Sequence, residues 1–389
     1  MIDIYSYDMV PLSDFLAEYK ELNTNNRFRP VAVGRYGIRT RESIYSKELA
    51  QDYSKNKLIY KDTLTVGMGS VQMDIGILTD DITYSVSPAY HTYRINGINC
   101  DYLRFCLQAR NADMFERYKK RGSRQGKSID LKAWLHYLIP VYEIDGQLQI
   151  VSTLHKIQSI IDDRMQQLQK LDDLVKARFV EMFGDPIHNE KGWMVSTLGE
   201  YMTLLTDFSA NGSYELLDSN VVMYDEPNYA IMVRTTDLEA GNLTNGVKYI
   251  DQSAYELLSK SKLYGGELIM NKIGSAGKIY MMPKIDRPAS LGRNAFMFRF
   301  DDRINMTYLY ALLSSDYGTK EIQQYVRGAV TKTITKESAR SIRIVVPPLE
   351  LQKQYAAFVQ QIDKSKFVVQ QALDKAQLLF DSLMQQYFG

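Results

Sequence analysis

The chain has 389 residues, of which 45% are hydrophobic and 24% are charged, and its formal net charge is +1. This length allows two or three domains, and the composition is that of a globular protein, which excludes a disordered or fibrous chain. No apolar run approaches the length of a membrane span, and the first residues lack the basic flank and apolar core of a signal sequence. We therefore expect a cytoplasmic protein with no membrane segment.

Positive charge is concentrated in one segment, although the whole chain is nearly neutral. Between Arg104 and Lys132 there are nine Lys or Arg residues against three Asp or Glu residues. Such a cluster, in a chain with 28 tyrosines, suits a surface that binds a polyanion. A solvated helix face with nothing bound would give the same pattern, so charge alone leaves both interpretations open.

The first half of the chain begins with short predicted strands and continues into a helix. β-Branched and aromatic residues predict strands over 64–68 and 92–95. An amphipathic pattern predicts one helix over 101–120, for which Asp101 is a plausible N-cap.

A long helix is predicted to close this first half. The stretch 147–182 contains no Pro and no Gly, and its apolar residues recur in steps of three and four. This spacing is typical of a coiled-coil seam. Gly184 and Pro186 follow as stop signals.

The second half repeats this order. Strands are predicted over 229–235, 267–273, 278–282 and 295–300. An amphipathic helix is predicted over 306–325, and a second long helix over 349–388.

Matching residues indicate that the two halves are copies of one module. Lys127-Ser128-Ile129 recurs as Lys332-Thr333-Ile334, 205 residues later, and Gln147 recurs as Gln352 at the same distance. Further pairs at this distance are Gln149 and Gln354, Ile157 and Ile362, Leu168 and Leu373, Leu174 and Leu379, and Phe183-Gly184 and Phe388-Gly389. A period near half the chain excludes a solenoid, whose repeats span only tens of residues. A duplicated module can contact two related sites.

We therefore expect an α+β protein with a pseudo-two-fold internal repeat. Two mixed α/β domains would occupy 1–146 and 185–348, and the two long helices 147–184 and 349–389 would separate them. Neither helix can bury its apolar stripe alone in water, so we expect them to pack on each other as an antiparallel coiled coil. In the alternative arrangement, each helix folds back onto its own domain as an ordinary bundle helix.

Catalytic motifs are missing from the sequence. The four histidines have no Cys, Asp or Glu partners at metal-ligand spacing, which predicts no metal site. The stretch 274–278 resembles a phosphate-binding loop, but Lys272 stands where its first Gly would be and Ile279 where it needs Ser or Thr. No dinucleotide-binding fingerprint and no nucleophile elbow is present. We expect that the chain catalyses no reaction itself.

Three segments resemble one known family. Val346-Pro347-Pro348-Leu349-Glu350-Leu351-Gln352 looks like the family's signature before its second conserved helix. The stretch 267–274 resembles a strand and turn of its target-recognition domains, and the Lys-Ser/Thr-Ile element before each long helix also fits. The order of domain, long helix, domain, long helix is similar to that of the DNA-specificity subunits of type I restriction-modification systems. The first copy departs from the family pattern, with Ile139-Pro140-Val141 where a double proline is usual.

The resemblance implies a mechanism that needs no catalytic residue in this chain. Each variable domain, a target-recognition domain, would read one half of a split double-stranded DNA sequence, while the spacer helices hold the domains apart. Two separate methyltransferase subunits, one per half, would bind S-adenosylmethionine and methylate adenine. A separate ATP-dependent motor-nuclease subunit would cut unmodified DNA. This chain itself would need no cofactor.

Candidate DNA contacts are basic, amide or glycine residues near the predicted loops. Arg reads guanine and Asn or Gln reads adenine through paired hydrogen bonds, and glycine lets the backbone approach a phosphate. In the first copy the candidates are Arg35, Arg39, Arg41, Gly67, Gly69, Gln72, Arg121, Arg124, Gln125 and Lys127. In the second copy they are Arg234, Lys272, Ser275, Lys278, Arg293, Asn294, Arg327 and Lys332. Each could instead be a solvated side chain, and Lys127 and Lys332 could serve the junction with the long helix.

The long helices also carry apolar residues that one seam does not cover. We expect these side chains to be exposed and to bind the methyltransferase subunits. They are Ile150, Ile160, Leu174, Tyr355, Val368 and Phe380.

Two other classes of protein remain as alternatives. The first is a non-catalytic coiled-coil adaptor whose end domains bind protein or glycan, which a steep salt dependence of DNA binding would exclude. The second is a self-contained methylating or nicking enzyme, against which the missing motifs argue.

Overall fold

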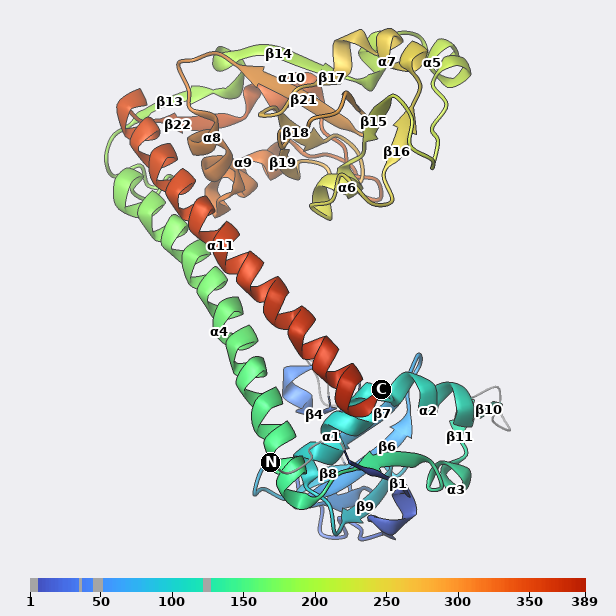
Figure 1. Ribbon diagram of the computed structural model, residues 1–389. Helices are drawn as coiled ribbons and strands as arrows, with labels where there is room; N and C mark the ends of the chain where they lie inside the picture. The colour runs from blue at the N-terminus through green and yellow to red at the C-terminus, as the bar shows by residue number, and fades with distance from the viewer. Residues whose placement is uncertain (1–5, 35–36, 45–51, 122–126) are drawn as a thin grey trace. The chain divides into compact units, whose positions relative to one another are not determined.

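The computed structural model describes residues 6–34, 37–44, 52–121 and 127–389 (Figure 1). The chain divides into two compact units, of which unit 1 comprises Met1–Gln167 with Val369–Gly389 and unit 2 comprises Leu168–Val368. Two 40-residue helices, α4 (Ile144–Phe183) and α11 (Leu349–Phe388), contribute to both units. No helix in the described ranges is long and apolar enough to cross a membrane.

Unit 1 is built around a four-stranded antiparallel sheet with the order β2-β9-β6-β7. These strands are β2 (Leu16–Tyr19), β9 (His91–Ile95), β6 (Thr63–Met68) and β7 (Met73–Ile77). Four antiparallel pairs surround it: β1 (Asp8–Pro11) with β12 (Leu138–Val141), β3 (Val31–Gly34) with β4 (Gly37–Thr40), β5 (Lys57–Ile59) with β8 (Tyr84–Val86), and β10 (Lys119–Arg121) with β11 (Lys127–Ile129). The remaining helices are α1 (Cys100–Ala109), α2 (Asn111–Tyr118) and α3 (Leu131–Trp134).

Unit 2 contains the equivalent sheet, β14-β21-β18-β19, and a second four-stranded sheet, β16-β15-β20-β17. The first consists of β14 (Met202–Asp207), β21 (Ala295–Phe300), β18 (Leu268–Asn271) and β19 (Ile279–Met281). The second consists of β16 (Lys248–Ile250), β15 (Ala230–Val233), β20 (Ala289–Leu291) and β17 (Lys262–Leu263). A further pair joins β13 (Met194–Thr197) to β22 (Arg343–Val346). Its helices are α5 (Tyr214–Asn220), α6 (Thr235–Glu239), α7 (Gln252–Leu257), α8 (Met306–Ser314), α9 (Asp316–Tyr325) and α10 (Lys336–Ser341).

Strand β18 shows why the sequence of unit 2 forms layers. Leu268 and Met270 pack with Phe298 and the helices, whereas Ile269 packs with Leu291 of the second sheet. Side chains alternate between the faces of a strand, so a strand covered on both faces must be apolar throughout. The first sheet therefore lies between a helical layer and the second sheet.

The predicted strands are confirmed, but the two shorter helices were predicted wrongly as single elements. The helix over 101–120 is α1 and α2, which meet at Arg110, and the helix over 306–325 is α8 and α9, which meet at Ser315. The Ser315 hydroxyl accepts a hydrogen bond from the Gly318 N–H at 3.3 Å and so caps a new helix. The predicted cap Asp101 is also wrong, because Asn99 is the residue whose side chain accepts from the Tyr102 N–H, at 3.0 Å.

The two long helices are confirmed, and they pack together in each unit. In unit 2, the Lys366 ammonium pairs with Asp172, and the Arg178 guanidinium lies 5.7 Å from the Phe358 ring centre. Because the residue numbers rise along one helix as they fall along the other, the segments run antiparallel. In unit 1, Leu154 of α4 shares the core with Phe380 of α11.

The internal repeat is confirmed by equivalent elements in the two units. The pairs β1–β12 and β13–β22, the sheets β2-β9-β6-β7 and β14-β21-β18-β19, and the helix pairs α1–α2 and α8–α9 correspond in order. The Tyr102 hydroxyl donates to the Pro140 carbonyl at 2.7 Å, and the Tyr308 hydroxyl donates to the Val345 carbonyl at 2.8 Å. The second sheet of unit 2 also has a smaller counterpart in unit 1, where the antiparallel pairs β3–β4 and β5–β8 are joined by a parallel bridge between Pro30 and Ser85.

Candidate nucleic-acid interface

Three turns of unit 2 are joined by backbone hydrogen bonds. The Lys272 N–H donates to the Asn294 carbonyl at 2.9 Å, and the Gly274 N–H donates to the Lys332 carbonyl at 3.0 Å. The Ile334 N–H then donates to the Lys272 carbonyl at 3.1 Å. Candidate residues from three distant stretches of the chain therefore lie on one continuous surface, which we call the turn platform (272–278, 293–294 and 327–334).

A buried carboxylate fixes two lysines behind the turn platform. Asp207 is only 6% exposed, and its two carboxylate oxygens accept from Lys272 Nζ at 2.8 Å and Lys336 Nζ at 2.9 Å. Burial by itself would raise the pKa of Asp207, but hydrogen bonds from the two ammonium groups outweigh it, so the pKa lies below its ordinary value. Two lysines share one carboxylate, so the cluster keeps an excess positive charge.

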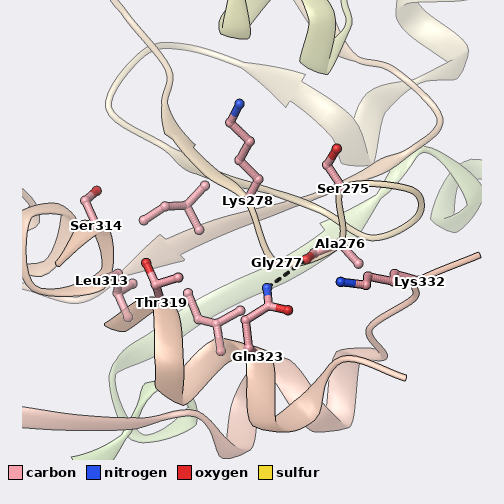
Figure 2. Close-up of a pocket in the computed structure, with 11 residues that line it drawn as sticks. Ser275, Ala276, Gly277, Lys278, Leu313, Ser314, Thr319, Gln323 and Lys332 are labelled. Carbon is pink, nitrogen blue, oxygen red and sulfur yellow. Dashed lines mark hydrogen bonds between the residues drawn. The ribbon is translucent and has the colours of Figure 1, made fainter. Parts of the chain in front are cut away.

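A cavity of about 400 Å³ lies beside the turn platform, between the loop 275–279 and the helices α8 and α9 (Figure 2). Gln323 Nε2 donates to the Ala276 carbonyl at 3.4 Å, and a Cβ on Gly277 would lie 2.5 Å from the Ile322 side chain. The loop therefore needs glycine at this position, where φ is +86°. Lys332 lines the cavity from the opposite turn.

The carboxyl ends of the parallel strands β15 and β20 form a second cavity, of about 260 Å³. Arg234 lines it but is held by the buried Asp237, with an Nε–Oδ2 distance of 3.0 Å, and donates to the Gly246 carbonyl at 2.8 Å. Arg293 also lines it, pairs with Asp218, and lies over the Phe208 ring. Asn294 is exposed beside them.

The remaining candidates of unit 2 differ in their freedom to reach a ligand. Lys278 forms an ion pair with Glu239. The Arg327 guanidinium donates to the carbonyls of Gln324 and Val326, the latter at 3.1 Å, which ties it to the end of α9. Ser275 is exposed at the turn platform.

The candidates of unit 1 are dispersed over several elements. Arg39 is exposed on β4, and Arg41 lies 5.4 Å from the Tyr53 ring centre. The backbones of Arg121 and Lys127 pair in the β10–β11 hairpin. Arg35, Arg124 and Gln125 lie outside the described residues.

Two glycine candidates of unit 1 have a structural reason to be glycine. A Cβ on Gly67 would lie 2.4 Å from the Tyr90 ring, so the Tyr90 ring fills the space that a side chain here would need. Gly69 lies in the turn between β6 and β7, where a Cβ would meet the Gln72 carbonyl oxygen at 2.3 Å. Gln72 itself is half-buried in this turn. Contact between these residues and DNA stays a prediction.

The expected exposure of the six apolar helix residues is wrong for three of them. Ile150, Tyr355 and Phe380 are 2%, 1% and 5% exposed, because the core of unit 1 or of unit 2 covers the helix faces that carry them. The other three, Ile160, Leu174 and Val368, are exposed. The sequence pattern could not distinguish these groups, since each helix also packs on a domain.

Sequence reasoning missed Asp207 and Lys336. Asp207 meets Lys272 across 65 residues and Lys336 across 129 residues. No local pattern marks such a cluster, and the only sequence signal is an acidic residue at the end of an apolar strand. No group of three or more His, Cys, Asp or Glu side chains within the described ranges could hold a metal ion.

Comparisons with known proteins agree on one family. Residues 190–375 match the model of the type I restriction modification DNA specificity domain. The chain is 23% identical over 273 residues to the type I restriction enzyme MjaVIII specificity subunit of Methanocaldococcus jannaschii, covering 67% of this chain and 63% of that protein. The putative type I restriction enzyme MjaX specificity subunit of the same organism is also 23% identical, over 69% of this chain and 62% of that protein. The chain thus spans less than two thirds of the length of these curated relatives.

Solved structures share the fold over nearly the whole chain. The S subunit of a type I restriction-modification system from M. genitalium has a TM-score of 0.56 at 14% identity, covering 100% of this chain and 98% of that one. A chain from a study of complex assembly and conformational transition of the type I R-M system has a TM-score of 0.57 at 16% identity, covering 98% and 97%. Family model, relatives and repeated fold agree, and the chain is similar to the specificity subunits of type I restriction-modification systems.

Proposed function

We propose that this chain recognises a bipartite double-stranded DNA sequence and directs partner subunits to it, without catalysing a reaction itself. Each unit reads one half of the target. The methyltransferase subunits bind S-adenosylmethionine and methylate adenine, and ATP-dependent restriction subunits cut unmodified DNA. A cytoplasmic setting remains a prediction that follows from this role.

The turn platform is the observation that carries the proposal. Asn294 and Lys332 are exposed on turns that backbone hydrogen bonds and the Asp207 cluster hold in place. An exposed Asn can make paired hydrogen bonds to adenine, and an exposed Lys can neutralise a phosphate. Because the turns are fixed before binding, little conformational entropy is lost on contact with DNA.

The proposed partners are supported by the exposed apolar side chains of the long helices. Phe367 and Val368 of α11 are 63% and 64% exposed in unit 2, and Leu378 is 71% exposed in unit 1. Exposed apolar side chains at neighbouring positions are typical of protein interfaces. The binding of one methyltransferase subunit to each unit remains a prediction. A fixed distance between the two DNA half-sites, set by the long helices, also remains a prediction. Adding one heptad to both helices would test it, because the preferred distance between the half-sites should change.

The decisive experiment uses the chain assembled with its methyltransferase. Sequencing of methylated adenines in a host that carries both identifies the target, which we expect to be a split motif. Binding to duplexes with this motif is then measured against scrambled duplexes over a range of salt concentrations. Lys332→Ala should weaken binding to all sequences and lower the salt slope by about 1, whereas Asn294→Ala should relax one base position.

The adaptor alternative predicts a different result. A protein whose units bind protein or glycan would show neither a split methylation motif nor a dependence of DNA affinity on Asn294. Equal affinity of the assembled complex for motif and scrambled duplexes would reject the proposed function.

A further inference from the structure

The tip of the hairpin between α9 and α10 presents methyl groups to solvent. The tip consists of Ala329, Val330 and Thr331, all of which are exposed. Val330 is 97% exposed, more than any other large hydrophobic side chain in the described part of the chain. Single exposed apolar residues are common on proteins, so this tip needs a second argument, which its frame provides.

The frame of the tip is rigid. The Arg327 N–H donates to the Thr333 carbonyl at 2.9 Å, and the Thr333 N–H donates back to the Arg327 carbonyl at 2.8 Å. Gly328 has a φ of +107°, and a Cβ there would lie 2.1 Å from the Thr331 carbonyl oxygen. A bridge between Ile273 and Thr333 fixes the hairpin to the turn platform. The methyl groups are therefore presented at a defined place.

The two cations that flank the tip do not share its surface. The Arg327 guanidinium donates to backbone carbonyls at the end of α9, and Lys332 lines the cavity beside the loop 275–279 (Figure 2). Apart from the Thr331 hydroxyl, the tip side chains therefore offer no hydrogen-bond donor or acceptor. Ala329 and Val330 therefore cannot read the amide, carbonyl and ring-nitrogen pattern of base edges.

One feature of a base edge is complementary to such a tip. In the major groove, thymine carries a C5-methyl group, and Ala and Thr methyl groups are among the side-chain groups that contact it. Valine is short and stiff about χ1, which suits surface contact better than insertion between stacked bases, for which longer apolar side chains are used. The positive charge of Lys272, Lys332 and Lys336 nearby favours the approach of a DNA strand to this side of unit 2.

We propose that Val330, with Ala329 and Thr331, determines specificity by contacting the C5-methyl group of a thymine in the half-site that unit 2 reads. This inference rests on the proposed function and adds to it the class of base and the residue that selects it. The half-site of unit 2 must then contain an A·T pair whose thymine methyl faces the tip.

Replacement of thymine by deoxyuridine tests the contact, because it removes the methyl group and leaves every hydrogen-bonding group of the base. The target is first mapped with the assembled complex, and exchange of residues 185–348 identifies the half-site of unit 2. Each thymine of that half-site is then replaced in turn. One replacement should weaken binding roughly fourfold, as expected for the loss of one buried methyl group.

Variants of the tip complete a double-mutant cycle. Val330→Ser should bind the thymine duplex less tightly and should no longer distinguish thymine from deoxyuridine at that position, whereas Val330→Thr should keep part of the preference. Ile82→Ser is the matched control, since Ile82 is an exposed apolar residue of unit 1, 56% exposed, and its replacement should leave the ratio unchanged.

The possible failures are distinguishable. A complex that binds its motif tightly but tolerates deoxyuridine at every position of this half-site would overturn the thymine contact and leave the proposed function intact. A half-site without an A·T pair would likewise overturn the thymine contact only. So would the finding that Val330→Ser weakens DNA binding because a partner subunit is lost from the complex. A complex with no sequence preference would reject the proposed function itself.

Discussion

Gln147 and Gln352 make the same two hydrogen bonds at equivalent places in the two units. Gln147 Nε2 donates to the Tyr142 carbonyl at 2.8 Å, and its Oε1 accepts from the Asn99 N–H at 2.9 Å. Gln352 Nε2 donates to the Pro347 carbonyl at 2.7 Å, and its Oε1 accepts from the Asn305 N–H at 2.8 Å. Each glutamine thus joins the start of a long helix to the cap of the helix that follows the main sheet. The sequence match at this distance has a structural cause.

Replacement of either glutamine should destabilise one unit. Gln147→Ala leaves a partly buried N–H and a buried carbonyl of unit 1 without their partner, which should cost about 2 kcal/mol, and Gln352→Ala should do the same in unit 2. Hydrogen exchange of the Asn99 and Asn305 amides measures the two effects separately. Exchange that rises equally in both units after a single replacement would contradict the assignment of one glutamine to each unit.

Asp207 should make the turn platform sensitive to acid. The pKa of Asp207 in the folded protein is lower than that of a free aspartate, which is about 3.9. The stabilisation by ionised Asp207 is therefore fully present above about pH 3.9, and it is lost as the pH falls through the lower pKa of the folded state. Asp207→Asn should remove this loss and should destabilise unit 2 at neutral pH by about 3 kcal/mol, because Lys272 and Lys336 lose their buried partner.

Unfolding followed from pH 7 to pH 2 for both proteins measures the effect. A control is Asp301→Asn: Asp301 pairs with the exposed Arg303 and lies outside the cluster. If Asp207→Asn were as stable as the wild type at neutral pH, the cluster would have no structural role.

Replacement of the apolar residues of the long helices should lower stability where the side chain is buried and leave it nearly unchanged where the side chain is exposed. Phe380→Ala opens the core of unit 1 and should cost about 3–5 kcal/mol of unfolding free energy, and Tyr355→Ala should do the same in unit 2. Val368→Ser should leave stability within about 0.5 kcal/mol of the wild type, because the side chain is exposed. Thermal unfolding measures the first effect. Titration of the methyltransferase subunit should show that Val368→Ser weakens its binding.

Exchange of residues 185–348 for the matching region of a related chain should alter one half of the recognised sequence. The physical reason is that this region contains both sheets of unit 2 and the turn platform, but no strand of unit 1. Sequencing of methylated adenines reads the result. A change in both halves would mean that the units do not recognise DNA independently.

The long helices and six of the strands could be predicted from the sequence, because each depends on a short window, and the repeat could be predicted because matching residues recur at one fixed distance. An unbroken stretch without Pro or Gly and with apolar residues every three or four positions can only be a long helix, and α4 and α11 follow it. The breaks at Arg110 and Ser315 were not predicted, because apolar periodicity continues across them while the caps depend on single side chains.

Tertiary contacts determine which candidate side chains are held by a carboxylate and which apolar side chains are covered. Arg234 and Lys272 look equivalent to Lys332 in the sequence. In the structure, however, buried carboxylates bind Arg234 and Lys272, whereas Lys332 is exposed. Ile150 and Ile160 stand on the same helix, yet only Ile150 lies against a domain core. Helical period is a property of neighbouring residues, whereas charge pairing and burial depend on groups that are far apart in the chain and meet only when it folds.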